Sequence, residues 1–550
     1  MKKQFAFAAI ACSLLLTAPA SRAQAPRGAS GESPVFDVYE YVVEGNTVLP
    51  AEAIERAVQP FLGPGKQFAD IEAARAALEK LYQDAGYLTV LVSLPNQQVD
   101  AGEVRMEVTE APVDKLLVTG AQHNLPSRIR EQVPSLAPGQ IPYFPQVQQE
   151  LASLQSADMQ VTPVINASES GQGIEVDLKV EDKPALSGSV EVNNSQSHNT
   201  RRGRVVGNIN YANLFQRGHS LGLSWQYAPY RPQDGNTLSA IYGLPLSGRD
   251  DLLLSFTQSR SDTPTNVGSG PTATLTRGEF FGLRWSRKLD AQNWPARHSF
   301  FASLDYKNNR DFNSYDSGLD VRKPALRYPL LAAGYNIAWN GADNALTTFS
   351  TSFAGSTSAM AGRKVDCNGE RLDQFDCKRS GSGPDFLAWQ LAIGHGETVF
   401  GNWRLNLSAD VQLASAPLPS GEQYSLGGRN TVRGYFDYEQ TGDQGWSQRI
   451  ELISPPWLQW GGVQFSSLVF ADRGFVQLFD PQTTQVARTH LGSQGLGLRV
   501  SDGQGLDVKL DVARVAFDTL RATDNGQRAY ASGPKAHRRY RVDLSVKQSF

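Results

Sequence analysis

From about residue 186 to its end, the chain consists of segments of about ten residues in which apolar and polar side chains alternate. The clearest is WRLNLSADVQL, residues 403–413, where every second residue from Trp403 onward is apolar. A strand turns successive side chains to opposite faces, so each segment predicts a strand with one apolar face. Such strands suit a transmembrane β-barrel, in which every backbone group pairs with a neighbouring strand. A soluble antiparallel sandwich also alternates and is the alternative fold.

The connections between these segments also favour a barrel, because long and short ones alternate. Long outer loops and short inner turns are typical of outer-membrane barrels. The long connections are expected near residues 228–236, 259–274, 310–326, 356–384, 415–444, 473–488 and 515–538, and the short ones near 215–219, 247–250, 340–343, 400–402 and 502–505. We expect about sixteen antiparallel strands, an even number that places both ends of the barrel on the short-turn side.

The last segment, YRVDLSVKQSF at residues 540–550, explains how such a barrel would close. Its apolar residues share one parity, its charged residues and serines share the other, and the chain ends on Phe550. We expect this strand to pair with the first strand of the barrel. An aromatic C-terminus on the lipid face is what outer-membrane barrels typically present to the barrel-insertion machinery, so Phe550 is the candidate insertion signal.

Two similar units precede the barrel, at residues 36–111 and 112–183. Each has the order strand, helix, helix, strand, strand, which makes them a tandem pair of α+β domains. The first strands correspond, since YVVEG at 41–45 and LLVTG at 116–120 both end on glycine. In the first unit, Asp70 is expected to cap the second helix.

The N-terminus has the features of an exported protein. Residues 1–23 contain two lysines, an apolar run and small residues before Ala23, which predicts a signal peptide, and residues 24–35 form a short segment after it. Two cysteines, Cys367 and Cys377, then remain in a polar loop, and their spacing in an exported chain favours a disulfide over a metal site. The net charge of -3 does not suggest a nucleic-acid partner, and no cofactor or metal is expected.

The most distinctive loop lies at residues 415–444, between two confident strands. It contains SLGGRNTVRGYF, whose glycines would allow tight turns inside a crowded pore. The central motif consists of Val432, Arg433, Gly434 and Tyr435.

A second motif, F-x-D-x-G, follows on the strand that begins near Val463, as Phe470, Asp472 and Gly474. Asp472 has the parity of the polar residues of this strand, so its side chain is expected to point into the lumen. An arginine fork fits a carboxylate in a bidentate way, which makes Arg433 and Asp472 a candidate pair. In the simpler alternative, Arg433 is a solvated loop residue and Asp472 lines a wet pore.

Together these features resemble the haemolysin secretion/activation family of ShlB, FhaC and HecB, the outer-membrane transporters of two-partner secretion. The resemblance runs from about residue 36 to the C-terminus. It implies two POTRA domains (36–111 and 112–183) and a sixteen-stranded barrel (184–550) whose loop 415–444 folds into the lumen. It also implies that Arg433 of the loop motif meets Asp472 of the barrel wall.

The resemblance further implies a function and its partners. A secreted exoprotein of the haemolysin/haemagglutinin type would bind the POTRA domains in the periplasm and cross the Gram-negative outer membrane unfolded. The candidate docking edges are the strands at 87–94 and 159–165, where a segment could add to a sheet. Many family members carry a plug helix before the first POTRA domain, but residues 24–35 are too few for such a helix and its linker.

Three other functions are alternatives to this one. An enzyme is disfavoured, because the sequence shows no nucleophile elbow, zinc spacing or phosphate-binding glycine loop. A passive porin would lack the POTRA repeats and the loop motif. An outer-membrane protein assembly factor of the same superfamily is the main alternative, but such factors commonly carry three or five POTRA domains rather than two.

Overall fold

The computed structural model describes residues 35–550 except 100, 156–158, 170, 172, 199, 267–273, 290–295, 311, 317–318, 342–344, 482–484, 523–527 and 533–538. The predicted signal peptide and residues 24–34 lie outside the described residues. The chain separates into two compact units, so the α+β domains and the barrel are described one at a time.

The first α+β domain has a three-stranded sheet in the order β2-β5-β4, with β2 parallel to β5. Its elements are β1 (Val35–Val38), β2 (Glu40–Glu44), α1 (Ala51–Val58), β3 (Gly63–Gln67), α2 (Phe68–Asp84), β4 (Val90–Ser93) and β5 (Glu103–Glu110). Both helices bury apolar side chains in one core with the sheet, including Ile54, Leu78 and Met106. The pair β1–β3 was not predicted. The prediction that Asp70 is the cap of α2 was wrong, because the helix begins earlier and Asp70 closes a capping box with Gln67 from its third position.

The second domain repeats this arrangement, with the sheet order β6-β8-β7 and β6 parallel to β8. Its elements are β6 (Val113–Thr119), α3 (Pro126–Glu131), α4 (Phe144–Leu154), β7 (Met159–Ala167) and β8 (Ile174–Asp182). The predicted α+β order is confirmed in both domains. The strands expected to offer free edges lie at sheet edges, as β4 and β7, although β4 is shorter than the predicted range 87–94.

The correspondence between the two domains extends to single glycines. Gly45 and Gly120 each follow the first strand of the sheet, with φ of 89° and 80°. A Cβ on Gly45 would lie 2.2 Å from the carbonyl oxygen of Val108, and one on Gly120 would lie 2.4 Å from that of Val180. Both the positive φ and the close approach to the neighbouring strand require glycine here, which explains why YVVEG and LLVTG end alike.

A carboxylate at the end of the central strand then holds the next turn in each domain. Glu110 accepts hydrogen bonds from the backbone N–H groups of Thr47 (2.7 Å) and Val48 (3.1 Å). Asp182 accepts them from the N–H groups of residues 122–124 at 2.8–2.9 Å. Burial raises the pKa of the Asp182 carboxyl, but these donors outweigh burial and the net pKa is lowered. The turn is therefore held by an ionised carboxylate at neutral pH.

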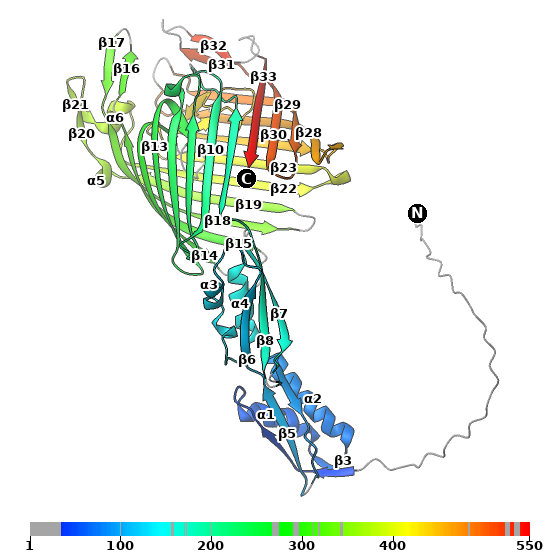
Figure 1. The fold of residues 1–550 in the computed structure, drawn as a ribbon. Coiled ribbons are helices and arrows are strands. Elements are labelled where there is room, and N and C mark those ends of the chain that lie inside the picture. Colours follow the sequence, from blue (N-terminus) through cyan, green and yellow to red (C-terminus); the bar gives the residue numbers. More distant parts are fainter. Residues whose placement is uncertain are drawn as a thin grey trace, which may run out of the picture. The chain divides into compact units, whose positions relative to one another are not determined.

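The barrel is a closed antiparallel sheet (Figure 1). It contains seventeen strand segments, of which the three-residue β27 (Leu458–Trp460) only folds back on β28, so sixteen strands form the wall. These are β9 (Leu186–Asn193), β10 (Arg204–Leu214), β11 (His219–Tyr227), β12 (Asn236–Pro245), β13 (Asp250–Asn266), β14 (Thr274–Leu289), β15 (Ala296–Asn309), β18 (Leu326–Asn340), β19 (Leu346–Ser356), β22 (Phe386–Thr398), β23 (Arg404–Ala414), β26 (Gln444–Ile453), β28 (Val463–Gln477), β29 (Arg488–Ser501), β30 (Leu506–Val515) and β33 (Tyr540–Ser549). The predicted strand number is confirmed.

The last strand closes the barrel against the first, as predicted, through the pairing of β33 with β9. The seam ends at Phe550, whose backbone N–H and carbonyl both bond to Gly188 at 3.0 Å. A Cβ on Gly188 would lie 2.5 Å from the Phe550 ring, so the glycine leaves room for this ring. The ring itself is 69% exposed on the outer wall, the position expected of a lipid-facing C-terminal aromatic.

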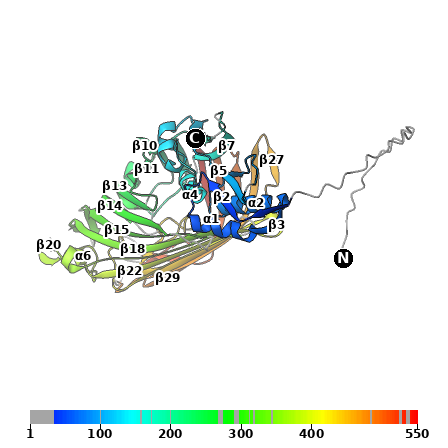
Figure 2. The same cartoon turned by 90° about the horizontal axis from the view of Figure 1, so that it is seen from below.

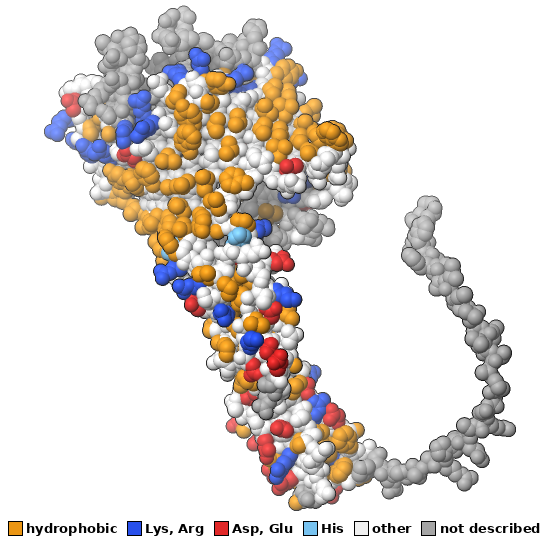
Figure 3. Space-filling view, viewed as in Figure 1, with side chains coloured by type: hydrophobic (Ala, Val, Ile, Leu, Met, Phe, Trp, Pro, Cys, Tyr) orange, Lys and Arg blue, Asp and Glu red, His pale blue; other side chains and the backbone are white. Residues whose placement is uncertain are grey.

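The two faces of the wall differ as the alternation predicts. On β33, Val542 and Leu544 are 48% and 41% exposed, whereas Asp543 and Ser545 between and beside them are buried. Apolar side chains therefore face outward and polar ones inward, which suits a lipid-embedded barrel. On the face seen in Figure 3, apolar side chains spread over the wall, and lysine and arginine gather at the end with the long loops.

Several long connections contain hairpins of their own. These are β16 (Phe312–Asp316) with β17 (Leu319–Lys323), β20 (Lys364–Cys367) with β21 (Glu370–Asp373), β24 (Tyr424–Leu426) with β25 (Gln440–Gly442), and β31 (Thr519–Ala522) with β32 (Arg528–Ser532). The loop at 356–384 also holds α5 (Ser358–Ala361) and α6 (Gln374–Lys378), which both contact β18, and α6 lies beside β18 in Figure 2.

Two predicted loop boundaries were wrong. The stretch near residues 259–274 continues the wall, because β13 runs to Asn266 and β14 begins at Thr274. Likewise, β28 continues to Gln477 into the expected loop 473–488. The β13 extension is a polar segment and the β28 extension contains Arg473 and Gly474, and both pair with a neighbouring strand. Tertiary pairing therefore overrides a loop-like local sequence. Separately, no helix within the described part of the chain has the length and apolarity to span a membrane.

Candidate functional site in the barrel lumen

The loop at residues 415–444 packs against the inward-facing side chains of the wall. Its short hairpin, β24–β25, contacts β26 and β28, and the loop buries Leu426, Val432 and Tyr435 almost completely. These side chains form one apolar cluster with Val476, Leu491 and Val515 of the wall. The loop therefore occupies the lumen in this structure.

Arg433 lies at the centre of the site and is brought against Asp472 of β28. Its Nε is 2.7 Å from one carboxylate oxygen of Asp472, and its Nη2 is 2.7 Å from the other. The backbone N–H of Arg433 donates to the same carboxylate at 3.1 Å. Both residues are 1% exposed. This is a buried bidentate pair, the geometry that makes an arginine–carboxylate contact strong and directional.

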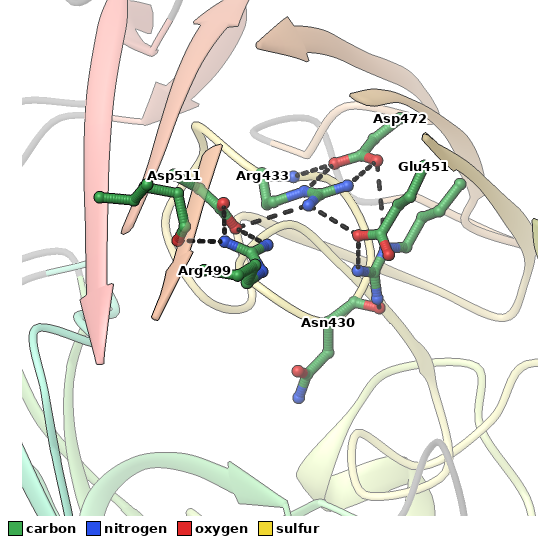
Figure 4. A network of polar contacts seen from close by, with 8 residues as sticks. Asn430, Arg433, Glu451, Asp472, Arg499 and Asp511 are labelled. Atoms are coloured by element: carbon green, nitrogen blue, oxygen red, sulfur yellow. Dashed lines mark hydrogen bonds and ion pairs between the residues drawn. The ribbon is translucent and has the colours of Figure 1, made fainter. Parts of the chain in front are cut away.

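Two further carboxylates complete the surroundings of Arg433 (Figure 4). Glu451 of β26 lies 2.8 Å from Nη1, and Asp511 of β30 lies 3.5 Å from the same nitrogen. Each also pairs with another arginine of the wall, Glu451 with Arg449 at 2.9 Å and Asp511 with Arg499 at 2.6 Å. Three arginines and three carboxylates from the loop and four strands thus form one network.

The sequence did not single out Glu451, Asp511, Arg449 or Arg499. Their only signal is their inward parity, which they share with many polar residues of the wall. Strand register brings them together, and this register is known only once the barrel is closed.

The remaining motif residues also have defined places. The Phe470 ring lies 3.6 Å from the Arg433 guanidinium carbon, a cation–π contact. Gly474 faces the loop hairpin, and a Cβ there would lie 2.4 Å from Leu426. Gly434 has φ of 88°, and a Cβ on it would lie 3.0 Å from that of Ala513. The two glycines therefore let the loop approach the wall closely.

Tyr435 attaches the loop at a further point. Its hydroxyl lies 2.9 Å from the carbonyl oxygen of Phe517 and 3.1 Å from that of Gly492. Because a buried phenol needs a hydrogen-bond partner, these backbone oxygens fix the ring position.

The carboxylate of Glu439, inside the loop, fixes the turn after the motif. It accepts from the backbone N–H of Phe436 at 3.0 Å and from the hydroxyl of Thr519, and it lies 3.3 Å from His198. Burial raises the pKa of the Glu439 carboxyl, but the contact with His198 and these hydrogen bonds outweigh burial, so the net pKa is lowered. Glu439 is thus a buried anion held by several elements.

The two roots of the loop meet at Asp443, which is fully buried. Its carboxylate accepts from Arg379 at 2.8 Å and from the backbone N–H groups of Leu418 (2.8 Å) and Phe479 (2.6 Å). Arg379 comes from the loop at 356–384, directly after α6. In the same loop, Cys367 and Cys377 form a disulfide. We name Arg379 and Asp443 the root clamp, which the sequence did not reveal because long loops have no periodicity.

The root clamp leads to a prediction about channel opening. We expect Arg379→Ala to increase the open fraction of the channel at least ~10-fold, because an unpaired buried carboxylate costs about 3–5 kcal/mol. The measurement is single-channel recording in planar bilayers, with Arg371→Ala in the same loop as the control. Equal open fractions in the two variants would show that the root clamp does not hold the loop.

Two protein-family models and several known proteins match this chain. The model of the haemolysin secretion/activation protein family ShlB/FhaC/HecB matches residues 172–500, more than half of the chain. The model of the ShlB-type POTRA domain matches residues 36–111. An outer membrane transporter CdiB of Escherichia coli is 24% identical over 466 residues, which cover 79% of this chain and 72% of the relative.

Solved structures show the same fold. CdiB from Escherichia coli superposes with a TM-score of 0.59 at 19% identity, covering 96% of this chain and 93% of that one. CdiB from Acinetobacter baumannii superposes with a TM-score of 0.53 at 16% identity, covering 94% and 91%.

Proposed function

The chain belongs to the haemolysin secretion/activation family of ShlB, FhaC and HecB, a family of two-partner secretion transporters and not of enzymes, and we propose that it secretes a partner exoprotein through its own lumen when loop 415–444 leaves. The barrel lies in the outer membrane. The exoprotein is of the haemolysin/haemagglutinin type and crosses as an unfolded chain.

One observation carries this proposal: loop 415–444 packs inside the barrel and is held there by charged groups as well as by one apolar cluster. The contacts of Arg433, Glu439 and Asp443 are ion pairs and hydrogen bonds, and water and a passing chain can replace them. The apolar cluster around Leu426, Val432 and Tyr435 is small, whereas a continuous apolar core would expose much more apolar surface on leaving. The loop at 415–444 is therefore suited to be a gate.

Recognition of the exoprotein is assigned to a free sheet edge of the POTRA domains. β7 is the longer of the two candidate edges, with nine residues against four in β4. An exposed edge has unpaired backbone groups that an extended segment can bond. Pro163 within β7 suits an edge strand, since proline cannot donate to a second neighbour. We assign β7 as the docking edge.

The experiment is secretion of a co-expressed partner exoprotein, measured in the culture medium. The partner is expected outside only when the transporter is present. Thr162→Lys with Asn166→Lys places two charges on β7 and is expected to lower secretion ~10-fold, because edge lysines block strand pairing. Gln148→Lys with Gln149→Lys adds the same charge to exposed positions of α4 and is the control.

Two results would count against these assignments. Secretion by the β7 variant at the level of the α4 variant would remove β7 as the docking edge. Release of the partner by cells without the transporter would show that it leaves by another route.

A further inference from the structure

Three arginines cluster on the outer wall, at the long-loop end of β28–β30. Arg473 lies on β28, Arg514 is the next-to-last residue of β30, and Arg539 precedes β33. Arg473 has the parity of the exposed Val469 and not of the buried Asp472, so it faces outward. All three line one hollow of about 830 Å³, which also includes Gln448 and Gln494. We name this hollow the arginine pocket.

Strand register explains why the wall is hollow here. Arg473 pairs across with Gly492 of β29, and Gln494 pairs across with Ala471 and Arg514. The glycine and the alanine offer almost no side chain between the longer polar ones. The Phe517 ring borders the hollow, since a Cβ on Gly492 would lie 2.8 Å from it.

The arginine pocket lies at the boundary between apolar and polar wall. One row toward the short-turn end, the outward residues are Val469, Leu496 and Val512, all 40–64% exposed. On β30 the outward residues Leu506, Val508, Leu510 and Val512 are all apolar, and Arg514 is the next outward residue, which marks the end of the apolar band. Tyr540, opposite Arg514 and 64% exposed, is the aromatic residue expected at an interface. The arginines therefore lie at headgroup depth.

Within the described residues, no ion pair balances the positive charge of the arginine pocket, because none of its three arginines forms one there. Among the described residues that line the pocket, the only carboxylate belongs to Asp472, which points inward to Arg433.

Two outward arginines elsewhere on the wall, in contrast, have polar partners. Arg310, directly after β15, pairs with Glu279, and Arg327 of β18 donates to Asn308, which itself donates to Glu279 at 2.7 Å. The same end of the barrel thus carries one set of arginines with a carboxylate among its partners and one set without.

We propose that the arginine pocket binds the phosphate groups of an outer-leaflet glycolipid, whose acyl chains lie along the apolar row below. Arginine forks match phosphate oxygens in geometry and charge. Lipid phosphates stand at headgroup depth, and their acyl chains continue toward Val469, Leu496 and Val512. The proposal rests on the outer-membrane location and not on the gate function of the loop.

The test uses the full-length protein in detergent and measures binding of lipopolysaccharide. The variant replaces Arg473, Arg514 and Arg539 with glutamine, and its affinity is expected to fall at least ~10-fold because charge-assisted contacts are lost. Arg327→Gln is the matched control and is expected to bind like wild type. The triple lysine variant keeps the charges but not the forks and is expected to bind with an affinity between those of wild type and the glutamine variant. Heat-modifiable gel mobility confirms that each barrel is folded.

Three results would overturn the proposal. Wild-type affinity in the triple glutamine variant would show that these arginines bind no lipid. Equal binding of dephosphorylated lipopolysaccharide would exclude phosphate as the recognised group. Inorganic phosphate bound as tightly as the lipid would exclude the glycolipid as the specific occupant.

Discussion

Arg433→Ala is expected to lower secretion of the partner exoprotein at least ~100-fold while the barrel still folds. The substitution leaves the buried carboxylate of Asp472 without its fork, and breaking a buried pair in this way costs about 3–5 kcal/mol, which is more than 100-fold in an equilibrium. The root clamp at Asp443 is intact in this variant and still holds both roots of the loop. The centre of the loop therefore stays in the lumen without a defined place and competes with the substrate. The wall keeps its strand-to-strand hydrogen bonds, so the barrel itself is unaffected.

Two variants make this result specific. Arg429→Ala removes another arginine of the same loop, one that is partly exposed and lies 3.3 Å from Glu191, and it should secrete normally. Arg433→Lys keeps the charge but not the fork and should give an intermediate level. Secretion is measured in the medium, after heat-modifiable mobility has shown folded barrels. Normal secretion by Arg433→Ala would remove the residue from the mechanism.

Tying the loop to the wall is expected to stop secretion completely and reversibly. Ser197, between β9 and β10, and Asp437 of the loop form an isolated bridge, and the N–H of Asp437 donates to the carbonyl of Gln196 at 3.0 Å. Bridged residues lie ~5 Å apart, which is within the Cα range of a disulfide. The double variant Ser197→Cys with Asp437→Cys should therefore cross-link the loop in its lumenal position.

The expected result is no secretion under oxidising conditions and recovery when a mild reductant is added. Wild type with and without reductant is the control, because the chain has its own disulfide, Cys367–Cys377. The single variants show whether loss of either side chain alone matters. Undiminished secretion by the cross-linked protein would mean that the loop need not leave the lumen.

The wall of the barrel could be predicted because the alternation of side chains along a strand can be read within a short segment of sequence. A strand in lipid must alternate at every residue, and segments such as 403–413 and 540–550 show this directly. Asp472 could be placed in the lumen by the same parity rule. Its partner Arg433 was found through the loop motif, since no periodicity connects a loop to a wall.

The rest of the site depends on contacts that only the closed barrel creates. Glu451 and Asp511 reach Arg433 because β26 and β30 lie on either side of β28 and β29, and parity alone could not choose them from the other inward polar residues. Arg379 and Asp443 lie 64 residues apart in the sequence and come from two different loops. The length of β13 was misjudged because its last residues are polar and extend the wall by pairing with β14.

The most direct test of the central claim asks whether the exoprotein passes the lumen face that the loop covers. Ser447 of β26 is inward, 1% exposed and next to Asp410, whereas Ile450 of the same strand is outward and 45% exposed. A cysteine at each position would carry a photoactivated cross-linker in cells that secrete the partner. We predict cross-links to the partner from position 447 during secretion, and none from position 450. Cross-links from 450 alone, or from neither position while secretion proceeds, would contradict passage through this lumen.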